Sequence, residues 1–486
     1  MSTEPAEIAT TSATELLRRL ESGRTTSVEL VDALLERIER HDGALGAFVT
    51  VDADGARHAA AAADAARAAG DGRLLLGLPI SLKDSFATAG LSTTSGRPNQ
   101  ADHVPDDDAT SVARLRGAGA VVLGKTNLPT AVSGQETANV VAGRTRNPWD
   151  LDRTPGGSSG GAAAALAAGL TPLELGSDSG GSIRQPAHCC GVHGHVATHG
   201  LLPQRGHLPS VPLDDVGATL DLFSTGPMAR HPEDLRLVLE LLAGADPVGP
   251  RAWTVALPPP VRTGLQGLRV AVVPTHPACP TGRSVRESLT RTADGLDRAG
   301  AQVVEAPLPF DVEHAMDVGF RLWAAASAPD DDGDGGVDDD LSLARRQAIS
   351  LSHGEWLRLD EERRALMRRW AAFLEDEVDV ALLPISPVPA LPHDPDEAHL
   401  HEVGHRLEAT IDVDGATRPY LDQVRWNVLV GLAGLPATAV PLGLGVEGLP
   451  VGAQVVAAPH RDLTAIAAAE ALVEVTGGFR PPPGWS

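Results

Sequence analysis

The sequence predicts an α/β protein whose chain forms one large domain. Apolar segments of strand length alternate with segments of helical periodicity, most clearly at residues 268–273 (strand), 284–296 (helix) and 303–305 (strand). Such alternation is typical of β-α-β units. No linker of biased composition divides the 486 residues, although their number would allow about three domains of ordinary size. A content of 42% hydrophobic and 21% charged residues is typical of a globular chain.

The first 70 residues are predicted to be a helical segment that packs on the main domain, which takes residues 71–486. Ser27 follows two threonines, and Glu29 comes soon after, a pattern that favours the start of a helix. Apolar residues then recur at helical spacing, at Val28, Val31, Leu34, Leu35 and Ile38. A second, alanine-rich helix is expected at residues 53–69.

The remaining elements follow in order along the main domain. Short apolar runs predict strands at residues 78–82, 120–123, 437–442 and 451–456. Helices are expected at residues 109–116, 162–168, 341–350, 356–377 and 463–473. A dense Asp/Gly run at residues 329–340 is interpreted as a solvated loop, because the ligand spacing and the glutamate of a calcium loop are not found there.

Charge and cysteine content exclude several classes of protein. The formal charge is 40 − 64 = −24, which disfavours binding to nucleic-acid backbones and to anionic lipid. Three cysteines cannot form a disulfide framework, and the N-terminus has no basic or apolar signal region. The longest small-apolar run, residues 161–170, is too short to span a bilayer. We therefore expect a cytoplasmic protein with reduced thiols and no nucleic-acid or membrane partner.

Lysine usage singles out two positions. The chain has only two lysines, Lys83 and Lys125, and its other 38 cations are arginines. Arginine serves as a surface cation, but it does not release its proton in proteins, whereas a desolvated lysine does. Each lysine is therefore a candidate for chemistry or for a tight packing role.

Three familiar motifs are present in the wrong context. GAVVLGKT at residues 119–126 matches a P-loop, but its spacer is the predicted strand, so Lys125 is expected to bond carbonyls or carboxylates at a strand end. GGSSG at residues 156–160 matches a nucleophile elbow, but no strand leads into it. A group of thiols and imidazoles lacks the ligand spacing of zinc sites and is interpreted as buried thiols and core histidines: His188, Cys189, Cys190, His193, His195 and His199.

Two glycine- and serine-rich segments are the strongest chemical signal. They are GGSSGG at residues 156–161 and GSDSGGSIRQPA at residues 176–187. Apolar elements surround both, and a flexible linker would not need Asp178, Ile183 or Arg184. Two glycines directly before Ser182 permit a tight turn with free main-chain N–H groups, which is how an oxyanion hole is built beside a serine nucleophile. Asp178 and Arg184 are expected to pair with each other.

At these segments the sequence resembles the amidase signature hydrolases. Further similar segments occur in family order: GLPISLKD at 77–84, GKTN at 124–127, GRTRNPWD at 143–150, RTPGGSSGG at 153–161, GLPA at 434–437 and GLPVGAQ at 448–454. The similarity covers about residues 13–473. The resemblance implies one α/β/α sandwich around a large mixed β-sheet. It implies no metal ion or organic cofactor.

The resemblance also implies a Ser-cisSer-Lys triad. Lys83 matches the base, Ser158 the bridging serine, and Ser182 the nucleophile. The main-chain amides of Ser179, Gly180, Gly181 and Ser182 match the oxyanion hole. Residues Ser133, Gly134 and Gln135 fall where members of the family form the wall of the substrate pocket. The segment at residues 128–137 lacks the acidic-aromatic pair of many members, which bears on substrate identity.

The triad is also physically reasonable. Lys83 acts as a base only when it is neutral, and an ordinary lysine has a pKa of about 10.4. Lowering that pKa to about 7.5 needs roughly 4 kcal/mol of burial and hydrogen-bond bias, which a strand end inside a domain could supply. Ser158 would then pass the proton of Ser182 to Lys83.

Three functions remain in competition. The first is an amidase that cleaves a small or aryl/alkyl amide, and also esters or carbamates. The second is the glutaminase subunit of a tRNA-dependent amidotransferase, which would need partner chains and is disfavoured by the negative charge. The third is a catalytically silent binding module on the same scaffold. A homodimer is left open, and Trp323, Trp356 and Trp426 are candidate pocket walls with a core role as the alternative.

Overall fold

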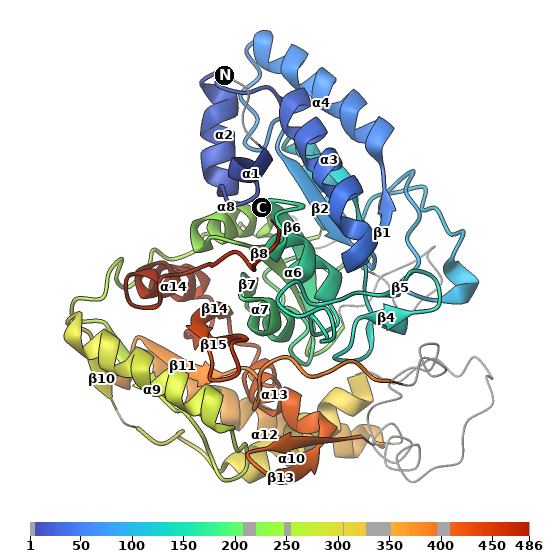
Figure 1. Cartoon of the computed structure of the whole chain (residues 1–486). Coiled ribbons are helices and arrows are strands. Elements are labelled where there is room, and N and C mark those ends of the chain that lie inside the picture. Colours follow the sequence, from blue (N-terminus) through green and yellow to red (C-terminus); the bar gives the residue numbers. More distant parts are fainter. Residues whose placement is uncertain are drawn as a thin grey trace.

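A mixed sheet of eleven strands forms the centre of the molecule (Figure 1). The computed structural model describes residues 5–207, 220–246, 254–304, 306–326, 351–395 and 409–485. In sheet order the strands are β1 (Phe48–Val51), β3 (Val121–Thr126), β2 (Pro79–Lys83), β6 (Leu173–Asp178), β8 (Ser224–Ala229), β7 (His193–Val196), β14 (Ala437–Leu444), β15 (Pro450–Val456), β11 (Val380–Pro384), β9 (Arg269–Val272) and β10 (Gln302–Val304). The pairs β2–β3, β2–β6, β9–β10 and β9–β11 are parallel, and the other neighbours are antiparallel.

Helices cover both faces of this sheet. Those in the described residues are α1 (Pro5–Ile8), α2 (Ala13–Glu21), α3 (Ser27–Leu45), α4 (Ala53–Ala68), α5 (Thr110–Gly117), α6 (Gly160–Ala167), α7 (Arg184–Cys190), α8 (Pro232–Leu242), α9 (Arg283–Arg298), α10 (Val312–Ala326), α12 (His353–Ala372), α13 (Arg425–Gly431) and α14 (Asp462–Thr476). Two small hairpins, β4 (Ala138–Asn139) with β5 (Gly143–Arg144) and β12 (Thr410–Val413) with β13 (Ala416–Pro419), lie outside the main sheet.

Strand β11 shows why two helical layers are needed. Val380 and Leu382 are buried in a cluster that includes residues of α9 and α14. Ala381 and Leu383 are buried in another cluster, which includes residues of α10 and α12. Successive residues of a strand point to opposite faces, so both faces of β11 are buried. The predicted sandwich of helices around a large mixed sheet is therefore confirmed.

The N-terminal segment contributes a strand as well as helices. Helix α3 begins after a capping box in which Thr26 and Glu29 bond each other's main-chain N–H groups, so the predicted helix start is confirmed. Strand β1, which the sequence reading missed, pairs antiparallel with β3. The helices of this segment gather at one end of the molecule in Figure 1. The division of the chain at residue 70 stays a prediction.

Several predicted bounds are corrected by the structure. The strand expected at residues 120–123 is β3, which continues to Thr126 and so contains Lys125. The helix expected at 356–377 is α12, which starts at His353 and passes into a wider turn at Phe373–Glu377. The helix expected at 341–350 and the Asp/Gly run at 329–340 lie outside the described residues. Within the described part of the chain, no helix combines the length and apolarity needed to cross a bilayer.

Candidate active site

Three chain segments meet at the C-terminal ends of two inner strands of the central sheet. Strands β2 and β6 are parallel neighbours, with Ser81 opposite Glu174 and Leu82 opposite Leu175. Their C-terminal residues therefore lie at the same edge, and these are Lys83 and Asp178. The loop that leads into α6 brings Ser158 to this edge, and the turn between β6 and α7 carries Ser182. The structure thus brings together the three residues that the resemblance names.

Lys83 is completely buried and is held by two hydroxyl groups. Its Nζ lies 2.7 Å from Ser158 Oγ and 3.0 Å from Ser177 Oγ. Burial lowers the pKa of Lys83 to about 7, although the carboxyl groups of Asp178 and Glu174 act in the opposite direction. A lysine in this position exchanges its proton near neutral pH.

Ser158 follows a cis peptide bond and is buried beside Lys83. The cis bond joins Gly157 to Ser158, as the resemblance implies. The main-chain N–H of Ser159 donates to the carbonyl oxygen of Ser182 at 3.0 Å, which fixes the two serine segments side by side. Ser182 is partly exposed, and its hydroxyl makes no hydrogen bond to another described residue. The structure therefore joins Lys83 to Ser158 directly and brings Ser182 into the same site without a direct bond between the two serine hydroxyls.

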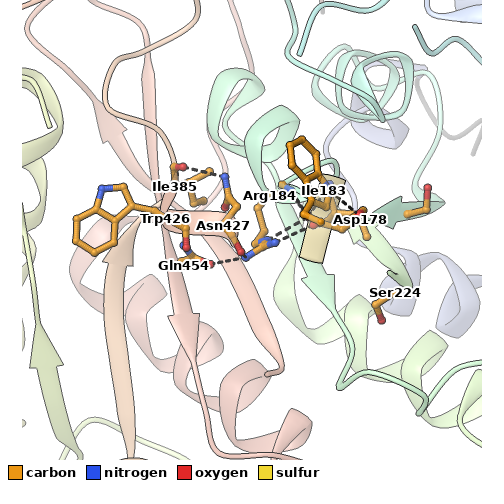
Figure 2. Close-up of polar contacts among 12 residues, drawn as sticks. Asp178, Ile183, Arg184, Ser224, Ile385, Trp426, Asn427 and Gln454 are labelled. Atoms are coloured by element: carbon orange, nitrogen blue, oxygen red, sulfur yellow. Dashed lines mark hydrogen bonds and ion pairs between the residues drawn. The ribbon is translucent and has the colours of Figure 1, made fainter. Parts of the chain in front are cut away.

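An ion pair holds the turn that carries Ser182. The guanidinium group of Arg184 donates to Asp178 at 2.7 and 3.0 Å, and both residues are buried. Arg184 also donates to Gln454 Oε1 at 2.8 Å and to the carbonyl oxygen of Asn427 at 3.2 Å (Figure 2). Burial alone would raise the pKa of Asp178, but Arg184 and two main-chain N–H groups hold that pKa below its usual value. The predicted pairing of Asp178 with Arg184 is confirmed.

The same carboxylate accepts a hydrogen bond from one of the four main-chain amides of the predicted oxyanion hole. The N–H of Gly181 donates to Asp178 Oδ1 at 2.8 Å, so that amide is not available to a substrate. The N–H groups of Ser179, Gly180 and Ser182 donate to no atom of the described residues. Gly181 has a φ of +113°, and a Cβ there would lie 2.5 Å from Asn427 Nδ2, so the tight turn needs glycine.

Trp323 covers the side of this turn. Its indole N–H donates to Ser179 Oγ at 2.9 Å. A Cβ on Gly180 would lie 2.8 Å from Cζ2 of the same indole, so the ring packs directly on the turn. Of the three tryptophans considered as pocket walls, Trp426 is buried in the core and Trp356 stacks on His353 in α12. Only Trp323 among these three contacts the residues around Ser182.

The segment predicted to line the pocket lies against the cis peptide. A Cβ on Gly157 would approach the carbonyl oxygen of Gly134 to 2.5 Å and the carbonyl carbon of Gln135 to 3.0 Å. Gln135 is buried, whereas Ser133 and Gly134 are partly exposed. The structure therefore places Gly134 and Gln135 beside the bond that joins Gly157 to Ser158. The contact of Ser133, Gly134 and Gln135 with a substrate stays a prediction.

Sequence reasoning missed two polar residues next to Lys83. Ser177 lies in a quoted motif, and its place in β6 one residue before Asp178 is a signal that could have been used. His207 is buried, and its Nε2 lies 2.9 Å from Ser177 Oγ. Burial and the nearby charge of Lys83 keep the pKa of His207 well below its usual value, so the ring is neutral. No pattern around residue 207 pointed to this contact.

The residues of the misleading motifs have structural contacts. Lys125 Nζ donates to the carbonyl oxygen of Phe86 and to Thr93 Oγ1, both at 2.7 Å, as the interpretation of a strand-end lysine predicts. Cys189 and Cys190 are buried free thiols. His188 bonds the carbonyl groups of Gly452 and Val388, and His193 bonds that of Arg230. His195 bonds the side chains of Thr438 and Asp462, and His199 bonds the carbonyl oxygen of Phe223. The interpretation as buried thiols and hydrogen-bonded core histidines is confirmed for all of these residues except His199, which is hydrogen-bonded but only half-buried.

Comparisons with known proteins agree with this geometry. The family model described as Amidase matches residues 29–465. A glutamyl-tRNA(Gln) amidotransferase subunit from Roseiflexus sp. (strain RS-1) is 35% identical over 500 residues, which cover 97% of this chain and 96% of the relative. A solved structure described as part of a vestigial protein complex that reveals the origins of an s-triazine catabolic enzyme has a TM-score of 0.79 and 31% identity, with 97% and 100% of the two chains covered.

A third comparison concerns a bacterial aryl acylamidase of the amidase signature family. Its solved structure has a TM-score of 0.80 and 25% identity, and the match covers 96% of each chain. The relatives thus share one fold over nearly their whole length, while their described activities differ.

Proposed function

The chain belongs to the amidase family, and from this premise we propose that it hydrolyses a carboxylic amide through an acyl-enzyme on Ser182. The observation that carries this proposal is the buried Lys83 Nζ at 2.7 Å from Ser158 Oγ, beside the turn of Ser182. A neutral serine is a weak nucleophile and needs a base, and a lysine with a pKa of about 7 serves as one near neutral pH.

Proton transfers through Ser158 accompany the formation of the acyl-enzyme. Ser182 Oγ attacks the carbonyl carbon, its proton passes to Ser158 Oγ, and the proton of Ser158 passes to Lys83 Nζ. When the C–N bond breaks, the leaving nitrogen receives a proton by the reverse route through Ser158. A water molecule then attacks the ester carbonyl with the same base, which releases the acid and frees Ser182.

The free main-chain N–H groups of the turn would stabilise the negative charge that develops on the substrate oxygen. We place the developing oxyanion at the N–H groups of Ser179, Gly180 and Ser182, since the N–H of Gly181 is bonded to Asp178. Trp323 and the Asp178–Arg184 pair hold these groups in position before the substrate arrives. The wall on the other side of Ser158 is Ser133, Gly134 and Gln135, which we propose to contact the substrate.

Two substrate classes have support from relatives. The 35% identical amidotransferase relative favours glutamine as the amide, with ammonia passed on inside a complex of several chains. The aryl acylamidase at 25% identity favours an aryl amide cleaved by the chain alone, and esters or carbamates remain accessible to the same acyl-enzyme. The higher identity gives the glutaminase role the stronger support. The three free thiols support the prediction of a cytoplasmic location.

One experiment tests the proposal and separates these classes. Purified wild type, Lys83→Met and Ser182→Ala are assayed on glutamine, aliphatic amides, anilides, carbamates and esters, with released ammonia, amine or alcohol as the readout. Activity that both variants lose supports the acyl-enzyme. Activity on glutamine that increases with copurified partner chains identifies a component of an amidotransferase. If a fluorophosphonate does not label wild type at Ser182, the chain is a silent binding module and the proposal is wrong.

A further inference from the structure

His207 contacts the base of the proposed mechanism through a single serine. Its Nε2 lies 2.9 Å from Ser177 Oγ, and the same oxygen lies 3.0 Å from Lys83 Nζ. The imidazole is packed between Phe86 and Phe223, at centroid distances of 4.9 and 4.5 Å. Its Nδ1 is buried and has no hydrogen-bond partner among the described residues. The only hydrogen bond of the imidazole within the described part of the chain is therefore the one to Ser177.

Counting protons among these groups decides the direction of that bond. The hydroxyl of Ser177 has one proton and accepts from others. When Lys83 is charged, it donates to Ser177 and Ser158, so the proton of Ser177 needs another acceptor. The described structure offers one, which is Nε2 of a neutral His207 with its proton on Nδ1. In the opposite tautomer, both Lys83 Nζ and His207 Nε2 would donate to Ser177 Oγ. The Ser177 proton would then face only the charged Lys83, which cannot accept it.

The same arrangement matters after Lys83 loses its third proton. A neutral amine has one lone pair, and it can accept a proton from Ser158 or from Ser177. Only acceptance from Ser158 serves the proposed reaction. If His207 holds the proton of Ser177, Lys83 continues to donate to Ser177 and its lone pair faces Ser158.

Resting on the function proposed above, we propose that His207 is a positioning residue that holds the Ser177 hydroxyl as an acceptor for Lys83 and so directs the lone pair of the base toward Ser158. His207 does not contact the reacting atoms in this proposal. It determines from which of the two serines the neutral lysine accepts a proton. The other ionisable groups that act on Lys83 are Glu174 and Asp178, both on β6, and they are present whatever stands at position 207.

The test measures how fast a fluorophosphonate labels Ser182 as pH is varied, because this reaction needs the base and no knowledge of the substrate. Ser182 Oγ attacks phosphorus, fluoride leaves, and the serine proton goes to the base. In His207→Leu we expect the plateau rate to fall about tenfold, the cost of a misdirected hydrogen bond. The pKa of Lys83, which the low-pH side of the labelling profile reports, should fall by about half a unit. The Ser177 hydroxyl is then free to donate its proton to Lys83 and so stabilises the neutral amine.

Matched variants separate this role from packing. His207→Gln keeps a polar group able to accept from Ser177 and should restore the rate to within about threefold of wild type. His193→Leu removes another buried imidazole, one bonded to the carbonyl oxygen of Arg230, and should leave the pH profile unchanged. A role of His207 in stability alone would lower the melting temperature and leave the profile as in wild type, which would overturn the proposal.

A second pair of variants keeps the proposal testable if His207→Leu does not fold. Ser177→Ala should lower the plateau rate of the wild-type chain. The double variants that combine Ser177→Ala with His207→Gln or His207→Leu should be labelled at the same rate as Ser177→Ala alone, because His207 acts only through Ser177. Losses that multiply would show that His207 acts independently of Ser177 and would overturn the proposal. If instead Lys83→Met is labelled as fast as wild type, the proposed function itself has failed, and the two failures are thereby distinguished.

Discussion

The two lysines of this chain are both buried in one sheet, and they differ in what surrounds them. Lys83 and Lys125 lie on the paired strands β2 and β3, where Lys83 is opposite Thr126 and Lys125 is opposite Leu82. Residues opposite each other share a face, and successive residues do not, so the two side chains point to opposite faces of the sheet. Both are completely buried, and burial lowers the pKa of Lys83 to about 7 and that of Lys125 to about 8.

Their partners explain the difference in role. Lys83 bonds two hydroxyl groups, and that of Ser158 has a proton to give to it. Lys125 bonds a main-chain carbonyl and Thr93, with the carboxylate of Asp84 at 3.7 Å. The carbonyl and the carboxylate only accept, and the Thr93 hydroxyl donates its proton to the carbonyl oxygens of Leu91 and Phe86, so none of these partners passes a proton to Lys125. Ser158, in contrast, can pass a proton to Lys83. A lowered lysine pKa is therefore not sufficient to identify a base, and the groups around it must be able to deliver a proton.

The largest effect is expected from Lys83→Met. It removes the base, so kcat/KM on any substrate found in the panel should fall by roughly 10⁴-fold. Burial of an apolar side chain of similar length should keep the melting temperature close to that of wild type. Residual activity above about one per cent of wild type would contradict the assignment of Lys83 as the base.

Lys125→Met should have the opposite pattern. It leaves Asp84 buried without its cation, which costs about 3–5 kcal/mol in the free energy of unfolding. The activity of the folded molecules should stay within about threefold of wild type, because Lys125 contacts neither Ser158 nor Ser182. Denaturant unfolding and active-site titration measure the two quantities separately. Asp84→Asn in the same chain is the matched control and should recover part of the loss.

The pH profile should report Lys83 alone. Its lowered pKa means that the neutral base is present above about 7 and is lost as pH falls below that value. We therefore expect kcat/KM to fall about tenfold per pH unit below that pKa and to level off above it. Lys125, with a pKa of about 8, should leave no second inflection. A profile that is flat between roughly pH 5 and 9 would contradict the assignment of Lys83 as the base.

The smallest effect is expected from Trp323→Phe. The ring still packs near Gly180, but Ser179 loses the indole N–H, so kcat should fall about fivefold. The pH profile should stay that of wild type, because the change affects the oxyanion side of the site and not Lys83. A shift of the acidic limb in this variant would show that the two sides are coupled.

Local sequence signals predicted the residues of the candidate site but could not predict all of their contacts. The start of α3 and the serines Ser158 and Ser182 could be predicted because each signal consists of residues that are close together in the chain. Strand β8 was missed because Gly226 and Pro227 lie inside it, and both are unfavourable in strands. The contact of His207 with Ser177 and that of Trp323 with Ser179 join residues 30 and 144 positions apart. No local pattern records such contacts, because tertiary packing makes them.

The bonds of Arg184 have a consequence for how the protein is made. Arg184 connects the turn of Ser182 to α13 and β15, and the bonded residues are 243 and 270 positions further along the chain. During synthesis the ribosome releases Lys83, Ser158 and Ser182 long before Asn427 and Gln454. Until those residues emerge, Arg184 has Asp178 as a partner but lacks Asn427 and Gln454, so the turn of Ser182 lacks part of its support. We therefore expect the turn of Ser182 to reach its final geometry only when translation is nearly complete.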